Sequence, residues 1–247
     1  VTATPIDSHP CQHAIVDACL PQDVYDAMLR HLPDRDAFRP MDLDDFNDGN
    51  GRSTRDVVEL SPVGVQRIAP QIQPLWQAVG AALSSAELKR AVFENLAEDL
   101  GPVMGCAPSE VNDQETFVFP SLHIETVAYH MPPHFDNHPR VATLLLYLPE
   151  DDSLDGLGTS LYDYAPKWQR PFRAAHREIR RAPFLPNTGI YFSGSRRRVR
   201  PGWHGFERPG SLQAEKPRVS LLVTWYTGDA QTHARYPEIV PVTPIAA

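Results

Sequence analysis

The chain has 247 residues, of which 42% are hydrophobic and 22% charged, and its formal net charge is -8. These values are ordinary for a globular protein that is long enough to bury a sizeable core. No stretch approaches the roughly 18 consecutive apolar residues of a membrane span, and a globally acidic chain is a poor binder of nucleic acid.

Twenty-five prolines are spread along the chain and exclude a bundle of long helices, because proline breaks helix interiors. Cys11, Cys19 and Cys106 show no CxxC spacing, which argues against a disulfide framework or a thiolate zinc site. The first residues, VTATPIDSHP, lack the basic start and apolar run of a secretory signal. Together these features indicate a reducing, cytoplasmic location.

The first hundred or so residues contain three stretches with the apolar spacing of amphipathic helices. They are residues 21–32, 71–83 and 84–101. In the last of them Ser84 and Glu87 form a capping-box pattern, and Gly101 is expected to end the helix. We therefore expect residues 1–114 to form a helical buttress that packs on a separate core.

From about Glu115 the pattern changes to short β-branched and aromatic runs bounded by Pro, Gly and Asn. These runs are residues 116–119, 122–130, 141–149, 158–164, 188–194 and 218–228. Short strands that follow helices predict a mainly β fold, with an antiparallel jelly-roll or barrel-like core over residues 115–247. The buttress and this core are expected to form one compact domain.

The stretch YHMPPHFDNHPR, residues 129–140, holds three histidines and one aspartate. Its two adjacent prolines exclude a helix, so His130 and His134 cannot form the i, i+4 pair of a helical zinc protease. In an extended chain His134 and Asp136 point to the same side, about 6.6 Å apart at Cα. They can therefore converge on one metal ion.

A third ligand should come from another strand, because His138 would lie roughly 13 Å from His134 along a straight strand. His204, in the segment RPGWHGFE, is the candidate. Two neutral imidazoles and one carboxylate that leave open positions are the arrangement of non-haem Fe(II) oxygenases. The other histidines considered are interpreted as structural or exposed: His123, His130, His138, His176 and His233.

The order of these motifs resembles the Fe(II)/2-oxoglutarate-dependent dioxygenase superfamily, nearest to its prolyl-hydroxylase-like branch. The matching elements, in chain order, are Tyr129, HFDN with His134 and Asp136, TLLLYL ending in Tyr147, DGLGTSLY with Gly156 and Gly158, WHGFE with His204, and RVSLLVTWY with Arg218 and Ser220. The resemblance spans about residues 115–228 and includes a Gly-rich hairpin at residues 155–162.

This resemblance implies a double-stranded β-helix whose Fe(II) ligands are His134, Asp136 and His204. It implies 2-oxoglutarate and O2 as cosubstrates, hydroxylation of an unactivated C–H bond, and succinate and CO2 as coproducts. Asp136 favours hydroxylation over halogenation, because halogenating relatives carry a small residue at that position. Desaturation, ring closure and epimerisation use the same ligands and stay open.

The resemblance further implies that Arg218 pairs with the distal carboxylate of 2-oxoglutarate, which a planar guanidinium can bind bidentately. Ser220 follows at i+2 on the same face and could share that carboxylate. Tyr129 and Tyr147 are further candidate hydroxyl donors. The interval from Arg218 to the Trp-Tyr pair at residues 225–226 is one residue longer than in that branch, so a β-bulge is expected.

A basic segment follows the Gly-rich stretch. Residues 165–200 contain ten Lys and Arg against the single acid Glu178, a net +9 that leaves -17 on the rest of the chain. With Arg196 and Arg198 as candidate contacts, this segment is expected to lie in loops near the site and to recruit a small anionic metabolite or amino acid, free or on an acidic carrier protein. Arg140 is a further candidate substrate contact. The alternative for the segment is a solvated basic loop.

Two other classes share part of this pattern. A cupin-type metalloenzyme that does not use 2-oxoglutarate would have the same barrel and His134, but it does not need Arg218. A non-catalytic jelly-roll binding module would have no affinity for iron. Within the oxygenase class, a hydroxylase that acts on a peptide or protein residue is the alternative to a small-molecule enzyme.

Overall fold

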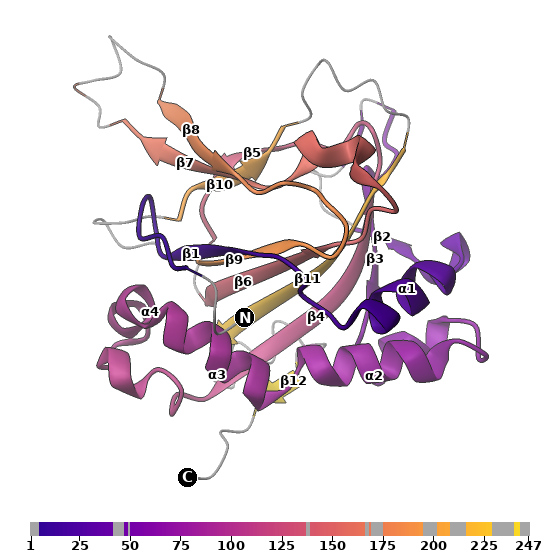
Figure 1. Cartoon of the computed structure of the whole chain (residues 1–247), viewed down its shortest axis with the longest axis horizontal. Helices are drawn as coiled ribbons and strands as arrows, with labels where there is room; N and C mark the ends of the chain where they lie inside the picture. Colours follow the sequence, from indigo (N-terminus) through magenta and orange to yellow (C-terminus); the bar gives the residue numbers. More distant parts are fainter. Residues whose placement is uncertain are drawn as a thin grey trace.

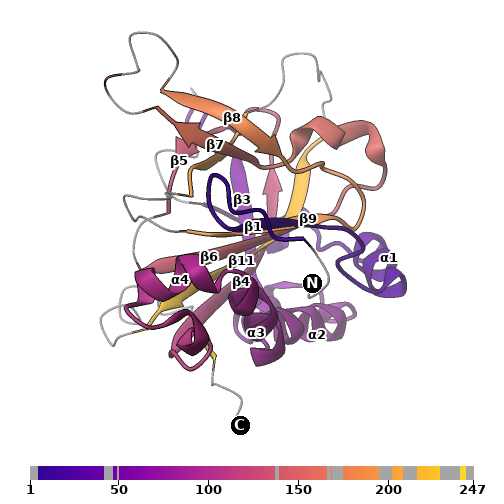
Figure 2. The same cartoon turned by 60° about the vertical axis from the view of Figure 1, so that its left-hand side comes forward.

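The computed structural model of the chain describes residues 5–41, 47–48, 50–136, 139–165, 168, 175–194, 202–207 and 216–228, together with the backbone of 240–242. Two antiparallel sheets lie face to face, and helices cover the outer face of the larger one (Figure 1). The view in Figure 2 shows the same layers from the side. The predicted fold class, a mainly β protein with a double-stranded β-helix core, is confirmed.

The larger sheet has the order β1-β9-β6-β11-β4-β3-β2. Strand β12 also pairs with β4, at residues 116–118, whereas β3 pairs with residues 121–125 of β4. Its strands are β1 His13–Val16, β2 Arg39–Pro40, β3 Arg55–Glu59, β4 Thr116–Glu125, β6 Arg140–Tyr147, β9 Gly189–Ser193, β11 Arg218–Thr227 and β12 Val240–Val242. The smaller sheet has the order β5-β10-β7-β8. Its strands are β5 Met131–His134, β7 Ser160–Tyr164, β8 His176–Arg181 and β10 His204–Phe206.

The helices are α1 Gln22–Arg30, α2 Gln73–Leu83, α3 Ala86–Asn95 and α4 Ala97–Met104. The described residues also form the short 3-10 helices η1 Arg35–Ala37, η3 Gly64–Arg67, η4 Pro108–Glu110 and η5 Asp152–Leu157. In Figure 1, α2, α3 and α4 lie along the face of the larger sheet that points away from the smaller one.

The third predicted helix is present but its details were wrong. Ser85, not Ser84, is the N-cap residue of α3, and its side chain accepts a hydrogen bond from the Leu88 backbone. The helical path breaks at Leu96, so α3 and α4 are separate helices. Gly101 lies inside α4, which ends at Gly105, where a φ of 76° suits a residue without a side chain.

The N-terminal part is not only helical, because β1, β2 and β3 are strands of the larger sheet. Propensity missed them, since each is short, and β1 and β3 are held by pairing with strands far along the chain. The boundary between residues 114 and 115 stays a prediction. No helix in the described ranges combines the length and the apolar character needed to cross a membrane.

Pro120 lies inside β4, although a proline was expected to bound the strand there. The sheet tolerates it because β3 pairs with Ser121–Glu125 and β12 with residues 116–118, which leaves Pro120 at the junction between the two partners. Its carbonyl accepts a hydrogen bond from the Leu60 backbone. The missing N–H of proline therefore interrupts neither ladder.

The sequence also raises expectations for the stretch 122–130, the Gly-rich stretch and the regularity of β11. The stretch 122–130 leaves the sheet at Glu125, so Tyr129 follows a turn. The Gly-rich stretch is not a hairpin, because η5 leads directly into β7. The β-bulge expected between Arg218 and Trp225 is absent, because β11 pairs with β4 without a register shift, and the one shift against β6 skips Val141 of β6.

Two apolar clusters fill the layers. The first lies between the helices and the larger sheet and includes Trp76, Phe93 and Trp225. The second lies between the two sheets and includes Tyr147, Phe184 and Phe206. Side chains alternate between the two clusters along β6 and β11, as the period of two in a strand requires.

Gly158 connects η5 to β7 where the chain passes the backbone of Ala182. A Cβ at this position would lie far inside van der Waals contact with the Ala182 carbonyl oxygen. We predict that Gly158→Ala lowers the free energy of unfolding by more than about 2 kcal/mol, because backbone must move. Thermal and denaturant unfolding test this, with exposed Ser153→Ala as the control; an unchanged melting temperature in both variants would contradict it.

Candidate active site

Three potential metal ligands from separate segments meet at the end of the smaller sheet. His134 ends β5, Asp136 follows it, and His204 begins β10. Strands β5 and β10 are antiparallel neighbours in which His134 and His204 are direct partners. The ligand atoms of the three side chains lie within 4.8 Å of one another, the one such group of three among the described residues.

Both imidazoles present the same nitrogen to the shared space. His134 Nδ1 lies 3.0 Å from the Pro132 carbonyl oxygen, and His204 Nδ1 lies 2.9 Å from the Gly202 carbonyl oxygen. A carbonyl oxygen only accepts hydrogen bonds, so each Nδ1 carries the proton. Each Nε2 therefore keeps its lone pair for a metal ion.

The protonation states also suit a divalent cation. Burial lowers the pKa of His204 to about 4, so its imidazole is neutral at physiological pH. Burial opposes ionisation of Asp136, but the Arg140 guanidinium and the two histidines hold the pKa of that carboxyl at about 2. Asp136 is therefore a carboxylate and His204 a neutral imidazole, the forms in which both side chains bind a metal ion.

Two neighbours on β6 hold the Asp136 carboxylate. Arg140 Nη1 donates to Oδ1 at 2.8 Å, and Thr143 Oγ1 donates to Oδ2 at 3.0 Å. Arg140 also donates to the Tyr226 hydroxyl at 3.3 Å. Arg140, expected to contact substrate, is thus placed beside a metal ligand, and a substrate contact stays a proposal. Thr143 was not foreseen, because nothing in its sequence context marks it.

Nitrogen and carboxylate ligands fit Fe(II), and their separation fits as well. The distance from His204 Nε2 to Asp136 Oδ1 is 3.8 Å, close to the span of two ligands with bonds of about 2 Å on one ion. Three protein ligands leave positions open for other molecules.

Arg218 is buried at the start of β11 and faces the space between the sheets, with 2% of its surface exposed. Its Nε donates to the Leu157 carbonyl at 2.8 Å, and Nη2 donates to Thr159 Oγ1 at 3.3 Å. Its Nη1 donates to Glu125 Oε2. The sequence did not point to Glu125 as a partner of Arg218, because the two residues lie 93 positions apart.

The other predicted cosubstrate residues lie close to Arg218. Ser220 is fully buried, and its Oγ has no hydrogen-bond partner in the described structure. Tyr147 is its direct partner on β6, and the Tyr147 hydroxyl accepts a hydrogen bond from the Thr159 backbone at 3.0 Å. An unpaired buried hydroxyl beside a guanidinium fits a ligand carboxylate.

Aromatic rings join the metal ligands to Arg218. The ring of Phe206, two residues after His204, lies 4.9 Å from the Arg218 guanidinium carbon. Tyr129 stacks on Phe206 with ring centroids 5.6 Å apart. Tyr129 is 4% exposed, and burial raises its pKa to about 12, so its hydroxyl is protonated. The metal ligands and the buried arginine thus border one apolar layer.

The basic segment is not a single loop. It contains β8 and β9, and Arg181 on β8 pairs with Glu178 at 2.6 Å and donates to the Gly156 carbonyl. Arg177 and Arg180 are exposed on the same strand. Arg196 and Arg198 lie outside the described residues, so their expected contact with substrate stays a prediction.

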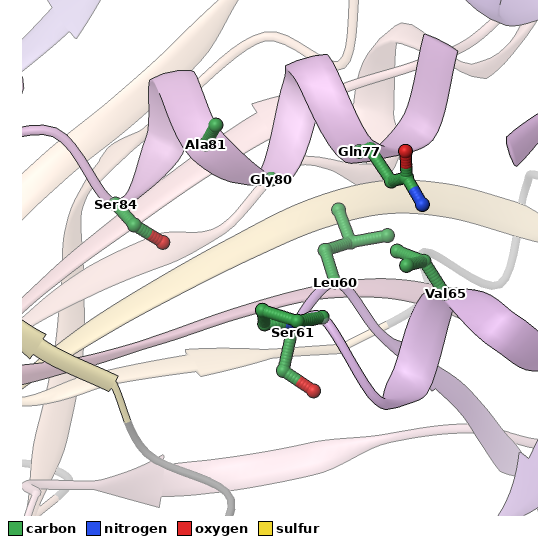
Figure 3. A pocket seen from close by; sticks show the side chains of 8 residues that line it. Leu60, Ser61, Val65, Gln77, Gly80, Ala81 and Ser84 are labelled. Atoms are coloured by element: carbon green, nitrogen blue, oxygen red, sulfur yellow. The ribbon is translucent and has the colours of Figure 1, made fainter. Parts of the chain in front are cut away.

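An apolar pocket of about 330 Å³ lies elsewhere, between α2 and the segment that follows β3 (Figure 3). Leu60 and Val65 line one side, and Gln77 and Ala81 of α2 line the other. Leu60 and Val65 belong to the apolar cluster on the helix side of the larger sheet. This pocket is therefore separate from the three ligands and from Arg218.

No protein-family profile matches the sequence, and no curated protein is similar to it. Solved structures with a similar course of the chain include a prolyl-4-hydroxylase from Pseudomonas putida, with a TM-score of 0.49 and 15% identity over 88% of this chain and 93% of that one. HygX from Streptomyces hygroscopicus, with nickel and 2-oxoglutarate bound, has a TM-score of 0.49 and 8% identity over 87% and 82%. The non-haem α-ketoglutarate-dependent epimerase SnoN from nogalamycin biosynthesis has a TM-score of 0.44 and 12% identity over 89% of this chain and 82% of that one.

Thr143 orients the Asp136 carboxylate, which makes it a test of the metal site. We predict that Thr143→Val weakens binding of a divalent metal by about tenfold, because the carboxylate loses one of its two anchoring hydrogen bonds. Titration with Co²⁺ or Ni²⁺ measures the effect, and Thr116→Val on β4 is the control, because its buried hydroxyl has no hydrogen-bond partner in the described structure. Equal affinities for the Thr143→Val variant and the wild type would show that this hydrogen bond does not matter.

Ser220 yields a prediction in which stability and binding change in opposite directions. Without ligand, Ser220→Ala should leave the protein as stable as the wild type or up to about 1 kcal/mol more stable, because an unpaired buried hydroxyl is removed. The same variant should bind 2-oxoglutarate more weakly. Denaturant unfolding and ligand titration test the two halves, and a loss of stability without ligand would indicate a structural hydrogen bond instead.

Proposed function

We propose that the protein is an Fe(II)/2-oxoglutarate-dependent oxygenase that hydroxylates an unactivated C–H bond. The observation that carries this proposal is the convergence of His134, Asp136 and His204 next to a buried arginine in the same interior layer. Arg218 and the unpaired Ser220 hydroxyl offer a site for a carboxylate, which a metal-binding module without a carboxylate cosubstrate does not require.

When bound, Fe(II) and 2-oxoglutarate supply the oxidising chemistry, with succinate and CO2 as coproducts. The protein contributes positions and charges. The Nδ1 hydrogen bonds of His134 and His204 fix the two rings, and Arg140 with Thr143 fixes the carboxylate between them. Arg218 and Ser220 would hold the distal carboxylate, and the surrounding aromatic rings exclude water.

We further propose a small anionic substrate, such as an amino acid or another metabolite, either free or tethered to a carrier protein. The exposed Arg177 and Arg180 of β8 and the net positive charge of residues 165–200 support this proposal. The alternatives are a peptide or protein residue as substrate and a cupin-type enzyme that does not use 2-oxoglutarate. A hydroxylase that acts on a peptide or protein residue would still need Arg218 to bind 2-oxoglutarate, whereas the cupin-type enzyme would not.

The central test is the release of succinate from 2-oxoglutarate with Fe(II) and O2, across a panel of amino acids and anionic metabolites. We expect substrate-stimulated succinate formation that Asp136→Ala reduces by at least about a thousandfold, since a catalytic metal ligand is lost. Asp152→Asn, which changes an exposed carboxylate, is the control. Turnover without 2-oxoglutarate would favour the cupin-type enzyme, and no metal affinity at all would favour a binding module.

A further inference from the structure

A buried ionic cluster lies across three neighbouring strands of the larger sheet. Arg55 on β3, Glu125 on β4 and Arg218 on β11 are direct partners in the two strand pairings. Glu125 is 1% exposed and Arg55 is 8% exposed. Metal coordination uses none of these residues, yet charged groups buried this deeply are costly unless they are balanced.

Glu125 lies between the two guanidinium groups. Its Oε2 accepts a hydrogen bond from Arg218, and its Oε1 lies 3.1 Å from Arg55 Nε. The latter contact is an ion pair by distance and not a hydrogen bond, because Arg55 Nε donates to His123 Nδ1 at 2.8 Å. Arg55 and Arg218 thus share one carboxylate.

His123 adds no charge to this cluster. Its Nδ1 accepts from Arg55, so the proton is on Nε2, which lies 2.7 Å from Ser121 Oγ. Burial, followed by the charge of Arg55, holds the pKa of His123 well below its usual value. The histidine expected to be structural is therefore a neutral spacer that orients Arg55.

These three side chains of the described structure, Arg55, Glu125 and Arg218, carry a net charge of +1, with two guanidinium groups against one carboxylate. The other side chains that contact Arg218 are neutral: Thr159, Tyr147, Phe184 and Phe206. Three of the five N–H groups of Arg218 donate to Leu157, Glu125 and Thr159. One carboxylate of a ligand would balance the cluster.

We propose that Arg55 is a positioning residue that sets the affinity for the cosubstrate through Glu125, without touching the cosubstrate itself. Arg55 offsets the charge of Glu125, so Arg218 keeps a full positive charge for the distal carboxylate. Glu125 in turn orients Arg218. This inference rests on the proposed function, because it assumes that 2-oxoglutarate binds at Arg218.

The proposal predicts a charge-dependent pattern in three variants. Arg55→Gln makes the cluster neutral and should weaken 2-oxoglutarate binding by at least about tenfold. Glu125→Gln raises the charge to +2 and should bind at least as tightly as the wild type. The double variant R55Q/E125Q returns the charge to +1 and should restore the affinity to within about threefold of the wild type.

Calorimetric titration of nickel-loaded protein measures these affinities without turnover. The second probe is 2-oxopentanoate, which has the same 2-oxo acid group but lacks the distal carboxylate. The loss in Arg55→Gln should appear with 2-oxoglutarate and be absent with 2-oxopentanoate. Arg39→Gln, which removes the exposed Arg39–Glu59 ion pair between β2 and β3, is the matched control and should change neither affinity.

Three results would overturn the inference alone: wild-type affinity in a folded Arg55→Gln variant, an equal loss for both probes, or no recovery in the double variant. If Arg55→Gln does not fold, Glu125→Gln can be compared with R55Q/E125Q, because these two variants differ only in the charge of Arg55. Glu125→Gln must then bind 2-oxoglutarate more tightly than R55Q/E125Q. A wild-type protein that binds metal but no 2-oxoglutarate would overturn the proposed function and this inference with it.

Discussion

The candidate site depends on the pairing of two short strands, β5 and β10. Their antiparallel register sets His134 directly opposite His204, although the two residues are 70 positions apart. Two prolines keep β5 extended, and backbone carbonyls two residues before each histidine fix the ring tautomers. A shift of one residue would turn one imidazole to the other face of the sheet and separate the ligands.

The larger sheet contributes a second, electrostatic constraint. It places two guanidinium groups and one carboxylate on the inner face of adjacent strands, where water cannot screen them. Apolar groups alone cannot balance the one excess positive charge of these three side chains, and a negatively charged ligand can. The unpaired hydroxyl of Ser220 on the same face has the same implication, because a buried polar atom normally has a partner.

The two constraints act on opposite sides of one apolar layer. Phe206 connects them, because it follows His204 on β10 and lies against Arg218 from β11. The two candidate histidine ligands belong to the smaller sheet and the cations to the larger sheet, so the distance between them is set by sheet packing. The helices on the far face stabilise the larger sheet through a separate apolar cluster and leave the interior free for polar groups.

Local pattern by itself determined most strands from residue 116 onward, though not β8 or β12, together with the extended path through Pro132 and Pro133 and the likeness of His134, Asp136 and His204 to metal ligands. These features follow from side-chain alternation and from proline geometry, which act within a few residues. The tertiary structure alone decided that Arg55 and Glu125 flank Arg218, that Thr143 anchors Asp136, and that the N-terminal part supplies strands. Pairing between distant strands creates the contacts of Arg218 and holds the N-terminal strands, and the position of Asp136 against β6 creates the contact of Thr143. The predicted apolar pattern encodes neither.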